Sequence, residues 1–277
     1  MQRYRIGEVS KILNVPVETI RFFEQKGIIH PVKDEFTNYR YYDTHDIHKL
    51  LEYKKYRELE FSLNESVNII KSANIQNFIE KLSEKQEEAN QKARYYELKA
   101  IKLQHYQNVL KNMPLVVGEY PVVNRPEGYY FIHRSYDAEG FHFKLAEKLK
   151  GIFDEMMKYY AFVENIFRVQ KEWFDGPQET EEFQWGFTIK KKWADALGVS
   201  FASSMEYISS AKSIYTILQV EEDNYFMPSQ LKPVLRYMEK QGLRISGDVF
   251  GNHIATSQDE GKEFRYMEVW VPIENKQ

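Results

Sequence analysis

The first sixty residues alternate short amphipathic stretches with turn-forming residues. Apolar side chains recur at helical spacing over residues 6–13, which predicts a short helix. A turn at Asn14 then precedes Pro16, a residue suited to the first turn of a helix. This second helix is expected to reach about Lys26 and to end at Gly27, because glycine favours helix C-terminal caps.

A turn-rich segment and a short aromatic strand come next. Residues 34–38 have the composition of a turn, and Tyr39-Arg40-Tyr41-Tyr42 has that of a strand. Thr44 is expected to cap a helix reaching about Leu59, and Ser62-Leu63-Asn64-Glu65 has the form of a capping box that opens another. Two helices followed by such a loop predict a winged helix-turn-helix, so DNA is the first partner to consider.

The second helix of a helix-turn-helix enters the major groove. Three of its residues are therefore expected to face DNA: Val17, Glu18 and Arg21. Phe22 and Phe23 are expected to divide their contacts between the domain core and the DNA backbone. The wing would hold Arg40 and a hydroxyl of Tyr39 or Tyr41 against phosphates. The alternative is a hairpin whose tyrosines only pack.

Residues 75–110 contain neither proline nor glycine, which predicts a long helix. One row of its residues recurs every seven positions: Ile75, Leu82, Ala89, Tyr96, Leu103 and Leu110. A thinner, alanine-rich row accompanies it: Ile79, Gln86, Ala93, Ala100 and Gln107. This is the pattern of a coiled-coil seam, so we expect an antiparallel coiled-coil homodimer. The alternative is a helix that folds onto the C-terminal part of its own chain.

Beyond residue 113 the pattern changes to strands mixed with helices. Strands are expected at residues 116–123, 129–136, 183–189, 214–220, 243–252 and 264–273. Amphipathic helices are expected at residues 141–160 and 228–241. The order predicts an α+β domain with an antiparallel sheet and helices on one side.

The last of these strands carries one acid among aromatic residues. Four residues share one of its faces: Phe264, Tyr266, Glu268 and Trp270. Four residues of an earlier strand also share a face: Phe183, Trp185, Phe187 and Ile189. A buried lone carboxylate is costly unless neutralised, so a cationic ligand held by Glu268 and the rings is one interpretation. The other is that Glu268 is exposed, or is paired with Arg265 or Arg134.

Composition narrows the class of protein. Aromatic residues make up 15% of the chain, enough for aromatic cores or a pocket with aromatic walls. Cysteine is absent, which fits a reducing compartment and disfavours thiolate metal sensing. No apolar run reaches the roughly 20 residues of a membrane helix, and no signal-peptide core is present, so a cytoplasmic protein is expected.

His45 and His48 are not expected to hold a metal, because no third ligand lies nearby. The net charge of −3 means that DNA affinity depends on well-placed cations.

Five segments of the first seventy residues carry a family resemblance: Tyr4-Arg5-Ile6-Gly7-Glu8-Val9-Ser10, Arg21-Phe22-Phe23-Glu24, Gly27-Ile28-Ile29, Asn38-Tyr39-Arg40-Tyr41-Tyr42 and Leu59-Glu60-Phe61-Ser62-Leu63-Asn64-Glu65. Together they resemble the DNA-binding domain of the MerR family of transcription regulators. The resemblance implies that four residues contact the operator: Arg21, Tyr39, Arg40 and Arg57. Two departures stand out, because the family usually has Tyr-Tyr at Phe22-Phe23 and glycine at Glu60.

Three segments of the second half carry a looser resemblance: Leu115-Val116-Val117-Gly118-Glu119, Ser246-Gly247-Asp248-Val249-Phe250 and Met267-Glu268-Val269-Trp270-Val271-Pro272-Ile273. They resemble the GyrI-like small-molecule-binding domain of multidrug-responsive activators. The resemblance implies that Glu268 is the pocket acid and that Trp185 and Phe264 are pocket aromatics. Drug-sensing relatives often have a glutamate where this chain has Gly251, so a neutral or zwitterionic effector is also open.

These expectations combine into one organisation. An all-α winged helix-turn-helix is expected at residues 1–73, a dimerisation helix at residues 74–112, and a GyrI-like effector-binding domain at residues 113–277. The expected protein is a ligand-responsive regulator without a cofactor and not an enzyme, whose partners are promoter DNA, a second copy, a small effector and RNA polymerase. In the MerR family, activation distorts an overlong promoter spacer. The alternatives are a GyrI-like hydrolase, with Glu268 as general base beside Tyr266, and a protein that only sequesters drugs.

Overall fold

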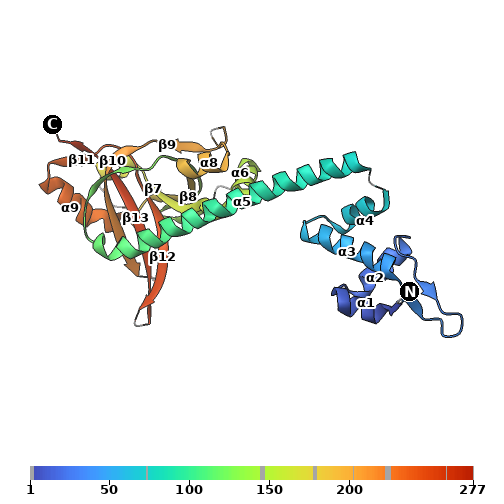
Figure 1. Ribbon diagram of the computed structural model, residues 1–277. Helices are drawn as coiled ribbons and strands as arrows, with labels where there is room; N and C mark the ends of the chain where they lie inside the picture. The colour runs from blue at the N-terminus through green and yellow to red at the C-terminus, as the bar shows by residue number, and fades with distance from the viewer. Residues whose placement is uncertain are drawn as a thin grey trace. The chain divides into compact units, whose positions relative to one another are not determined.

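The computed structural model describes residues 3–72, 74–143, 147–176, 180–201, 203–221, 226–259 and 261–276. The chain divides into two compact units, Met1–Arg94 and Tyr95–Gln277. Helix α5 (Ile75–Asn112) passes through the boundary, so the helix expected as a separate segment is shared between the units (Figure 1). In the described part of the chain no helix is long and apolar enough to cross a lipid bilayer.

The first unit begins with short helices and strands. Their bounds are β1 Tyr4–Arg5, α1 Ile6–Leu13, α2 Val17–Gln25, β2 Val32–Lys33, β3 Arg40–Tyr42, α3 Thr44–Glu58 and α4 Leu63–Ser72. Strand β3 pairs antiparallel with both β1 and β2. The expectation of an all-α unit was therefore wrong in one respect, because the wing strand recruits Tyr4 and Arg5 into a small sheet.

A compact core joins these elements. Its fully buried side chains are Val9, Ile20, Phe23, Ile29, Tyr42 and Leu50. Gly27 follows α2 with a φ of 66°, as the sequence predicted for a C-terminal cap. Helix α3 starts differently from the prediction, because Asp43 rather than Thr44 is its N-cap and its carboxylate accepts from the Asp46 amide at 3.0 Å.

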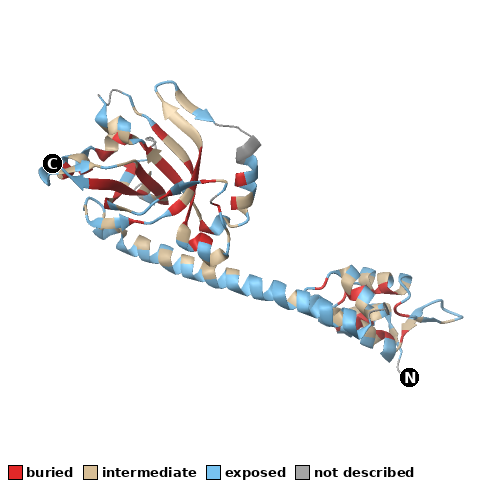
Figure 2. Ribbon diagram, turned by 90° about the horizontal axis from the view of Figure 1, so that it is seen from above, coloured by how far each residue is buried: buried red, intermediate tan, exposed pale blue. Residues whose placement is uncertain are grey.

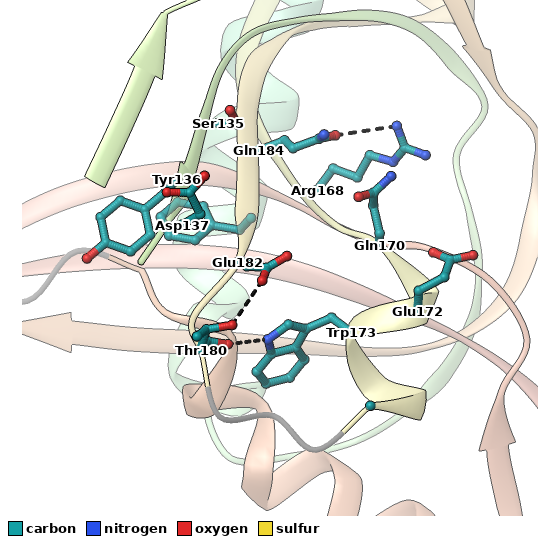
Figure 3. Close-up of a pocket in the computed structure, with 12 residues that line it drawn as sticks. Ser135, Tyr136, Asp137, Arg168, Gln170, Glu172, Trp173, Thr180, Glu182 and Gln184 are labelled. Atoms are coloured by element: carbon teal, nitrogen blue, oxygen red, sulfur yellow. Dashed lines mark hydrogen bonds between the residues drawn. The ribbon is translucent and has the colours of Figure 1, made fainter. Parts of the chain in front are cut away.

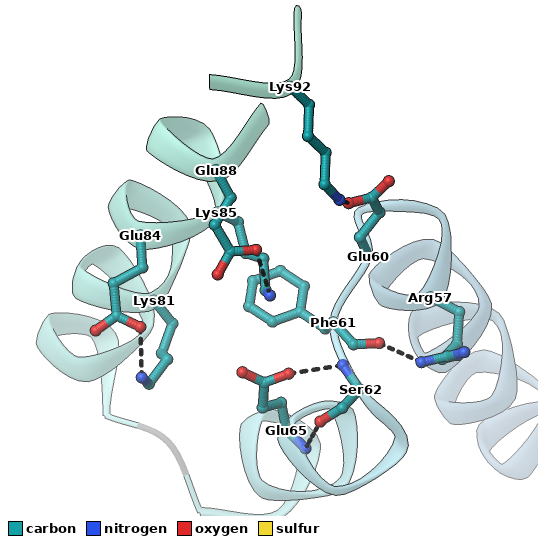
Figure 4. A network of polar contacts seen from close by, with 10 residues as sticks. All are labelled: Arg57, Glu60, Phe61, Ser62, Glu65, Lys81, Glu84, Lys85, Glu88 and Lys92. Atoms are coloured by element: carbon teal, nitrogen blue, oxygen red, sulfur yellow. Dashed lines mark hydrogen bonds and ion pairs between the residues drawn. The ribbon is translucent and has the colours of Figure 1, made fainter. Parts of the chain in front are cut away.

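The turn between α3 and α4 packs against the first part of α5 (Figure 4). The predicted capping box is confirmed, since the Ser62 amide donates to Glu65 at 2.6 Å and the Glu65 amide to the Ser62 hydroxyl at 3.2 Å. Glu60 stands where the MerR family usually has glycine, yet it adopts the left-handed conformation with φ of 64°. Its carboxylate forms an ion pair with Lys92 of α5.

The second unit contains, after α5, strands, α-helices and short 3₁₀ helices (η). Their bounds are η1 Met113–Leu115, β4 Val122–Arg125, β5 Gly128–Asp137, β6 Gly140–Phe143, α6 Glu147–Met157, η2 Tyr160–Phe162, β7 Val163–Val169, α7 Lys171–Asp175, β8 Phe183–Lys190, α8 Lys191–Leu197, β9 Glu206–Ile208, β10 Ala211–Glu221, η3 Pro228–Leu231, α9 Lys232–Lys240, β11 Leu243–Ile245, β12 Val249–Asp259 and β13 Lys262–Asn275.

The described strands of this unit form one ten-stranded sheet. Its main order is β4-β10-β13-β12-β7-β8-β5-β6, with β11 beside β13 and β9 beside β5. Every one of these ladders is antiparallel. The predicted α+β class with an antiparallel sheet is therefore confirmed.

The two faces of β13 have different environments. Met267 and Val269 lie in an apolar cluster with Val234 of α9. The alternate residues Glu268 and Trp270 point to the opposite face and are also buried. Figure 2 shows buried residues along the strands of the sheet, whereas helix α5 carries none.

A second apolar cluster involves the last part of α5. Tyr95 and Leu98 pack against a cluster that contains Phe162 and Trp193, the latter from α8. The Tyr95 and Phe162 ring centroids are 5.7 Å apart. Within the second unit, α5 therefore packs on the domain that follows it, which was the alternative in the sequence interpretation.

Some expected elements differ from those observed. The helix predicted from residue 141 begins only at Glu147, because residues 140–143 pair with β5 as strand β6. The strand predicted at residues 243–252 is two strands, β11 and β12, and the first predicted strand begins at Val122. Strand β7 was not predicted, although it lies in the middle of the sheet.

Candidate functional site

Helix α2 presents a polar face outside the core of the first unit. Ile20 and Phe23 are fully buried, whereas Glu18 and Arg21 are exposed and Val17 is half-buried. The three residues expected to face DNA therefore lie outside the core, in agreement with the helical periodicity. The expected contacts with DNA remain predictions.

Phe22 has a mixed environment. It is half-buried and packs against the core of the first unit. The Lys26 ammonium lies 5.4 Å from its ring centroid, within the range of a cation–π contact. The phenylalanine keeps the packing function of an aromatic residue here but supplies no hydroxyl for a phosphate.

The wing connects to α2 through an ion pair. Arg40 Nε lies 2.8 Å from Glu24 Oε1, which fixes the direction of the arginine beside α2. Tyr39 is 55% exposed, and the Arg5 guanidinium lies 4.9 Å from its ring centroid. Tyr41 is half-buried. Arg5 was not among the sequence-predicted site residues, although the pattern Arg5-Ile6-Gly7 lies next to the wing through the β1–β3 ladder.

The tip of the wing exposes a large apolar residue. Phe36 is 96% exposed, and the turn around it is held by Asp34, whose carboxylate accepts from the Phe36 and Thr37 amides at 3.1 and 2.8 Å. These hydrogen bonds hold the pKa of Asp34 below its ordinary value. Sequence reasoning did not identify Phe36 as a surface feature.

Arg57 has a structural contact in addition to its predicted one. Its Nη1 donates to the Phe61 carbonyl at 2.5 Å and so ties the end of α3 to the turn before α4 (Figure 4). Arg57 as a whole residue is exposed, and its expected operator contact remains a prediction. Of the two histidines on α3, His48 Nδ1 lies 3.0 Å from the Thr44 carbonyl oxygen and His45 is exposed.

The predicted dimer seam of α5 lies on the surface. Its large apolar members are exposed by 75% at Ile75, 37% at Leu82, 65% at Tyr96 and 67% at Leu103. Three alanines of the seam are also exposed: Ala89, Ala93 and Ala100. Leu110 is half-buried and lines a pocket of the second unit. An exposed apolar row on a long helix is available to a partner, which stays a prediction.

Glu268 is the centre of a buried polar cluster in the second unit. Its side chain is buried, and its Oε1 lies 3.3 Å from Lys190 Nζ at the end of β8. Asn252 Nδ2 donates to the same oxygen at 3.3 Å, and the Tyr215 hydroxyl donates to Oε2 at 3.3 Å. The acid is therefore neither exposed nor paired with Arg265 or Arg134; Arg265 instead lies 3.4 Å from Glu263.

A second acid completes the cluster. Glu164 Oε2 lies 3.1 Å from Lys190 Nζ, and its Oε1 forms an ion pair with Lys102 of α5. Asn252 Nδ2 also donates to Glu164, at 2.7 Å. The cluster thus contains two carboxylates and two ammonium groups, contributed by β7, β8, β13 and α5.

Burial and neighbouring charges act in opposition on these groups. Burial disfavours the charged form of Glu164, but the ammonium groups of Lys190 and Lys102 outweigh it and lower the pKa to about 2. Burial also opposes the charge of Lys190, yet the two carboxylates raise its pKa above the ordinary value. Burial raises the pKa of Glu268, opposed by Lys190. The cluster therefore pairs two carboxyl groups with two ammonium groups.

A pocket of about 550 Å³ opens beside this cluster. Helix α5 forms one wall with Lys102, His105 and Tyr106, and strands β7 and β12 form others. The β7–β12 ladder pairs residues 166–169 with 249–252, and the pocket is lined by residues 163–165 and 253–256 beyond that ladder. The Tyr106 hydroxyl donates to the Ile254 carbonyl across the pocket. The volume suits a drug-sized molecule.

The predicted pocket aromatics are not brought together. Strand register places Gly186, Ile166 and Asn252 on the face of Glu268, so the neighbouring Trp185 points to the opposite face. There its ring lies 5.9 Å from that of Phe167. Aromatic residues beside Glu268 are instead Trp270 and Tyr215, with ring centroids 5.6 Å apart.

Phe264 and Tyr266 lie further along β13 and are half-buried. They pair with Ser257 and Ala255 of β12 and are outside the described lining of the pocket.

Gly251 also belongs to the opposite face. A Cβ at this position would clash with the Phe167 ring and come within 2.6 Å of the Glu268 carbonyl oxygen. Phe167 in turn stacks on Phe226 at a centroid distance of 3.7 Å. The glycine therefore makes room for a ring of the core, and it does not set the charge of the pocket as the sequence suggested.

Another pocket, of about 440 Å³, is lined by the ends of β5 and β7 and the start of β8 (Figure 3). Polar side chains line much of it: Ser135, Asp137, Arg168, Gln170, Glu172, Thr180, Glu182 and Gln184. Arg168 is already bound by Asp248, with an Nη2–Oδ2 distance of 2.6 Å, and Trp173 Nε1 donates to the Thr180 carbonyl at 2.6 Å. Sequence reasoning did not identify this pocket.

Comparison with known proteins gives a family match for the first unit. The model of the MerR HTH family regulatory protein matches residues 4–73. The HTH-type transcriptional regulator ZntR homolog of Haemophilus influenzae is 36% identical over 70 residues, which are 25% of this chain and 52% of the relative. The HTH-type transcriptional regulator HmrR of Sinorhizobium medicae is 38% identical over 60 residues, 22% of this chain and 41% of the relative.

The chain thus spans about half the length of the curated relatives it matches. Among solved structures, the EcmrR–DNA complex covers 98% of this chain and 100% of the compared chain, at 16% identity and a TM-score of 0.35. The sequence match and the geometry of α1, α2 and the wing agree on the first unit. Residues 4–73 form a helix-turn-helix domain of the MerR regulatory family.

Proposed function

We propose that the chain is a transcription regulator that binds promoter DNA through its first unit. The observation that carries the proposal is the arrangement of α2 and the wing in a MerR-type domain, with Arg21 exposed on the helix. Arg40 is directed by Glu24 toward the same side of the domain as α2. Arginines on a recognition helix and on a wing supply base and phosphate contacts respectively.

The proposed DNA surface is built from the exposed residues of these two elements. Glu18 and Arg21 would reach base edges, while Tyr39 and Arg40 would contact phosphates. Arg5 adds a cation beside Tyr39. Because the whole chain carries a net charge of −3, these local cations supply the electrostatic attraction.

The second copy in this proposal binds along the exposed seam of α5. Ile75, Leu82 and Leu103 are large apolar residues left open to solvent, and an antiparallel coiled coil would cover them. A two-fold dimer suits a two-fold promoter element. As in the MerR family, it would act with RNA polymerase in the cytoplasm by distorting the promoter spacer.

The effector in this proposal enters the pocket beside Glu268, in a GyrI-like domain. The supporting observation is that α5 forms a wall of this pocket through Lys102 and Tyr106. A molecule that fills the pocket must favour one arrangement of these contacts over another, and only this difference in affinity can change the state of the dimer. The same helix carries the proposed dimer seam.

Two alternatives gain no support from the geometry. A general base needs an available carboxylate near a reactive substrate, whereas Glu268 is bound by Lys190, Asn252 and Tyr215, so we propose no enzymatic activity. A protein that only sequesters drugs has no use for the helix-turn-helix domain. Some matched relatives carry names of heavy-metal regulators, but their similarity covers only 22% and 24% of this chain, and this chain has no cysteine.

Titration of a labelled DNA duplex, followed by fluorescence anisotropy at several salt concentrations, tests the DNA proposal. Arg40→Ala should weaken binding to duplexes of every sequence and reduce the slope of log K against log salt by about 1. Arg21→Ala should cost about 1–3 kcal/mol on a preferred sequence. Arg244→Ala, which removes an exposed arginine of the second unit, is the control. Unchanged affinity and salt slope in both test variants would refute the assignment.

A further inference from the structure

The carboxylates of the pocket already have counter-ions supplied by the chain. Glu268 Oε1 accepts from Lys190 and Asn252, and its Oε2 accepts from Tyr215. Glu164 Oε1 accepts from Lys102, and its Oε2 accepts from Asn252 and contacts Lys190. All four carboxylate oxygens are therefore engaged before any ligand arrives.

The cluster also has no excess of acidic groups over basic ones. The carboxyl groups of Glu164 and Glu268 are matched in number by the ammonium groups of Lys102 and Lys190, and burial, which raises the pKa of Glu268, further reduces the negative charge. His105 lines the same pocket, and burial together with Lys192, Lys190 and Lys102 lowers its pKa to about 4, so it is neutral at pH 7. A cation that leaves water for this pocket loses its hydration and meets no excess of negative charge in return.

The remaining surface of the pocket suits an uncharged molecule. Apolar side chains of α5 and β12, among them Leu103, Val109 and Ile254, line it beside the polar cluster. Such a lining supplies apolar contact over most of a ligand, while a few polar groups orient it. Trp270 lies behind the cluster, with Lys190 Nζ 5.6 Å from its ring centroid, so the aromatic face that a ligand cation would seek is taken by the lysine.

We propose that this pocket selects effectors without net charge, and that Lys190 sets the selection by neutralising Glu268 and Glu164 in advance. The inference rests on the proposed function of the pocket as the effector site. The deciding group is a lysine, since removing its charge turns a compensated cluster into a net acidic one. Removing the charge of Glu268 instead turns it into a net basic one.

Three probes of similar shape test this charge rule with the full-length chain. Tetraphenylphosphonium is a cation, tetraphenylborate an anion, and triphenylphosphine oxide is neutral. Isothermal titration calorimetry measures their binding to the wild type and to each variant. Lys190→Met should tighten tetraphenylphosphonium binding about tenfold, a change that corresponds to about 1.4 kcal/mol of binding free energy. The affinity for the neutral oxide should stay nearly unchanged.

Glu268→Gln keeps the side-chain shape and gives the opposite prediction. It should weaken tetraphenylphosphonium and tighten tetraphenylborate, each about tenfold, and it decides the question if Lys190→Met does not fold. Lys240→Met, which removes an exposed lysine of α9, is the matched control and should change nothing. The double variant Lys190→Met/Glu268→Gln should return to the wild-type preference.

Two results would overturn the proposal. One is a wild type that binds tetraphenylphosphonium about tenfold more tightly than the neutral oxide. The other is a phosphonium affinity that is the same in the wild type and in whichever folded charge variant is measured. DNA titration of the wild type separates failure of this inference from failure of the proposed function. If DNA binding persists while the charge rule fails, only the ligand class is wrong. If the charge rule holds without DNA binding, the regulator proposal fails instead.

Discussion

Replacement of Lys190 by methionine tests the physical basis of the buried cluster directly. Methionine has a similar length and fills most of the lysine stem, so the change removes a charge with little loss of packing. In the native chain the ammonium lies 3.1 Å from Glu164 and 3.3 Å from Glu268. Its loss leaves two buried carboxylates with Lys102 as the remaining cation of the cluster.

The size of the stability loss in Lys190→Met follows from the desolvation of the unpaired acid. At these distances each charge pair is worth roughly 5 kcal/mol of gross attraction at an effective dielectric constant of about 20. Much of that attraction offsets the burial of the charges, so removing one partner costs about 3–5 kcal/mol of the free energy of unfolding. Glu268→Gln should cost less, about 1 kcal/mol, because Lys190 keeps Glu164 as its counter-ion.

The stability of Lys190→Met should also depend on pH, in a direction set by the pKa of Glu268. Without Lys190, the pKa of Glu268 rises further above its ordinary value, since burial already raises it. A folded-state pKa above the unfolded one means that protonation stabilises the fold. The stability deficit of the variant should therefore be smallest below the unfolded pKa, about 4.3, and grow as the pH rises through the folded pKa.

Urea unfolding of the wild type and both variants at several pH values, followed by tryptophan fluorescence, measures these quantities. The expected order of stability at pH 7.5 is wild type, then Glu268→Gln, then Lys190→Met. The reasoning fails if Lys190→Met costs less than about 1 kcal/mol at that pH. It also fails if the deficit of Lys190→Met does not depend on pH.

Two further changes test local features. Glu60→Gly should raise the melting temperature by a few degrees, because glycine adopts the left-handed conformation of Glu60 without strain. The control Glu58→Gly, at the last residue of α3, should lower the melting temperature, and equal shifts in the two variants would contradict this account. His105→Gln should reduce the loss of stability between pH 6.5 and pH 4, since the lowered pKa of His105 favours its neutral form in the folded chain. The effect on the free energy of unfolding is under about 1 kcal/mol, because the ring is partly exposed. Unfolding curves at pH 7.5 and 5 measure it.

Local sequence signals predicted most of the first unit. The capping box at Ser62 and Glu65, the glycine that ends α2 and the helical periodicity before it all act within a few residues. Such interactions do not depend on distant parts of the chain. The small sheet was missed because strands of two or three residues leave almost no alternation to read.

The pocket of the second unit depends on contacts between distant residues. Lys190 belongs to the run Lys190-Lys191-Lys192, which suggests a solvent-exposed segment, and its partner Glu268 lies 78 residues away. The alternation of a strand shows which residues share a face but not which face of the sheet they meet. For this reason Trp185 could be grouped with Phe183 but not placed relative to Glu268.

Selection of bound duplexes from a random-sequence library by the full-length chain tests the central claim most directly. The account predicts that the enriched sequences share a motif with two-fold symmetry, read by two copies of α2 and the wing. It also predicts that the enrichment disappears with Arg21→Ala. If the chain enriches no sequence, or an asymmetric motif that Arg21→Ala leaves unchanged, the protein is not the dimeric promoter-binding regulator proposed here.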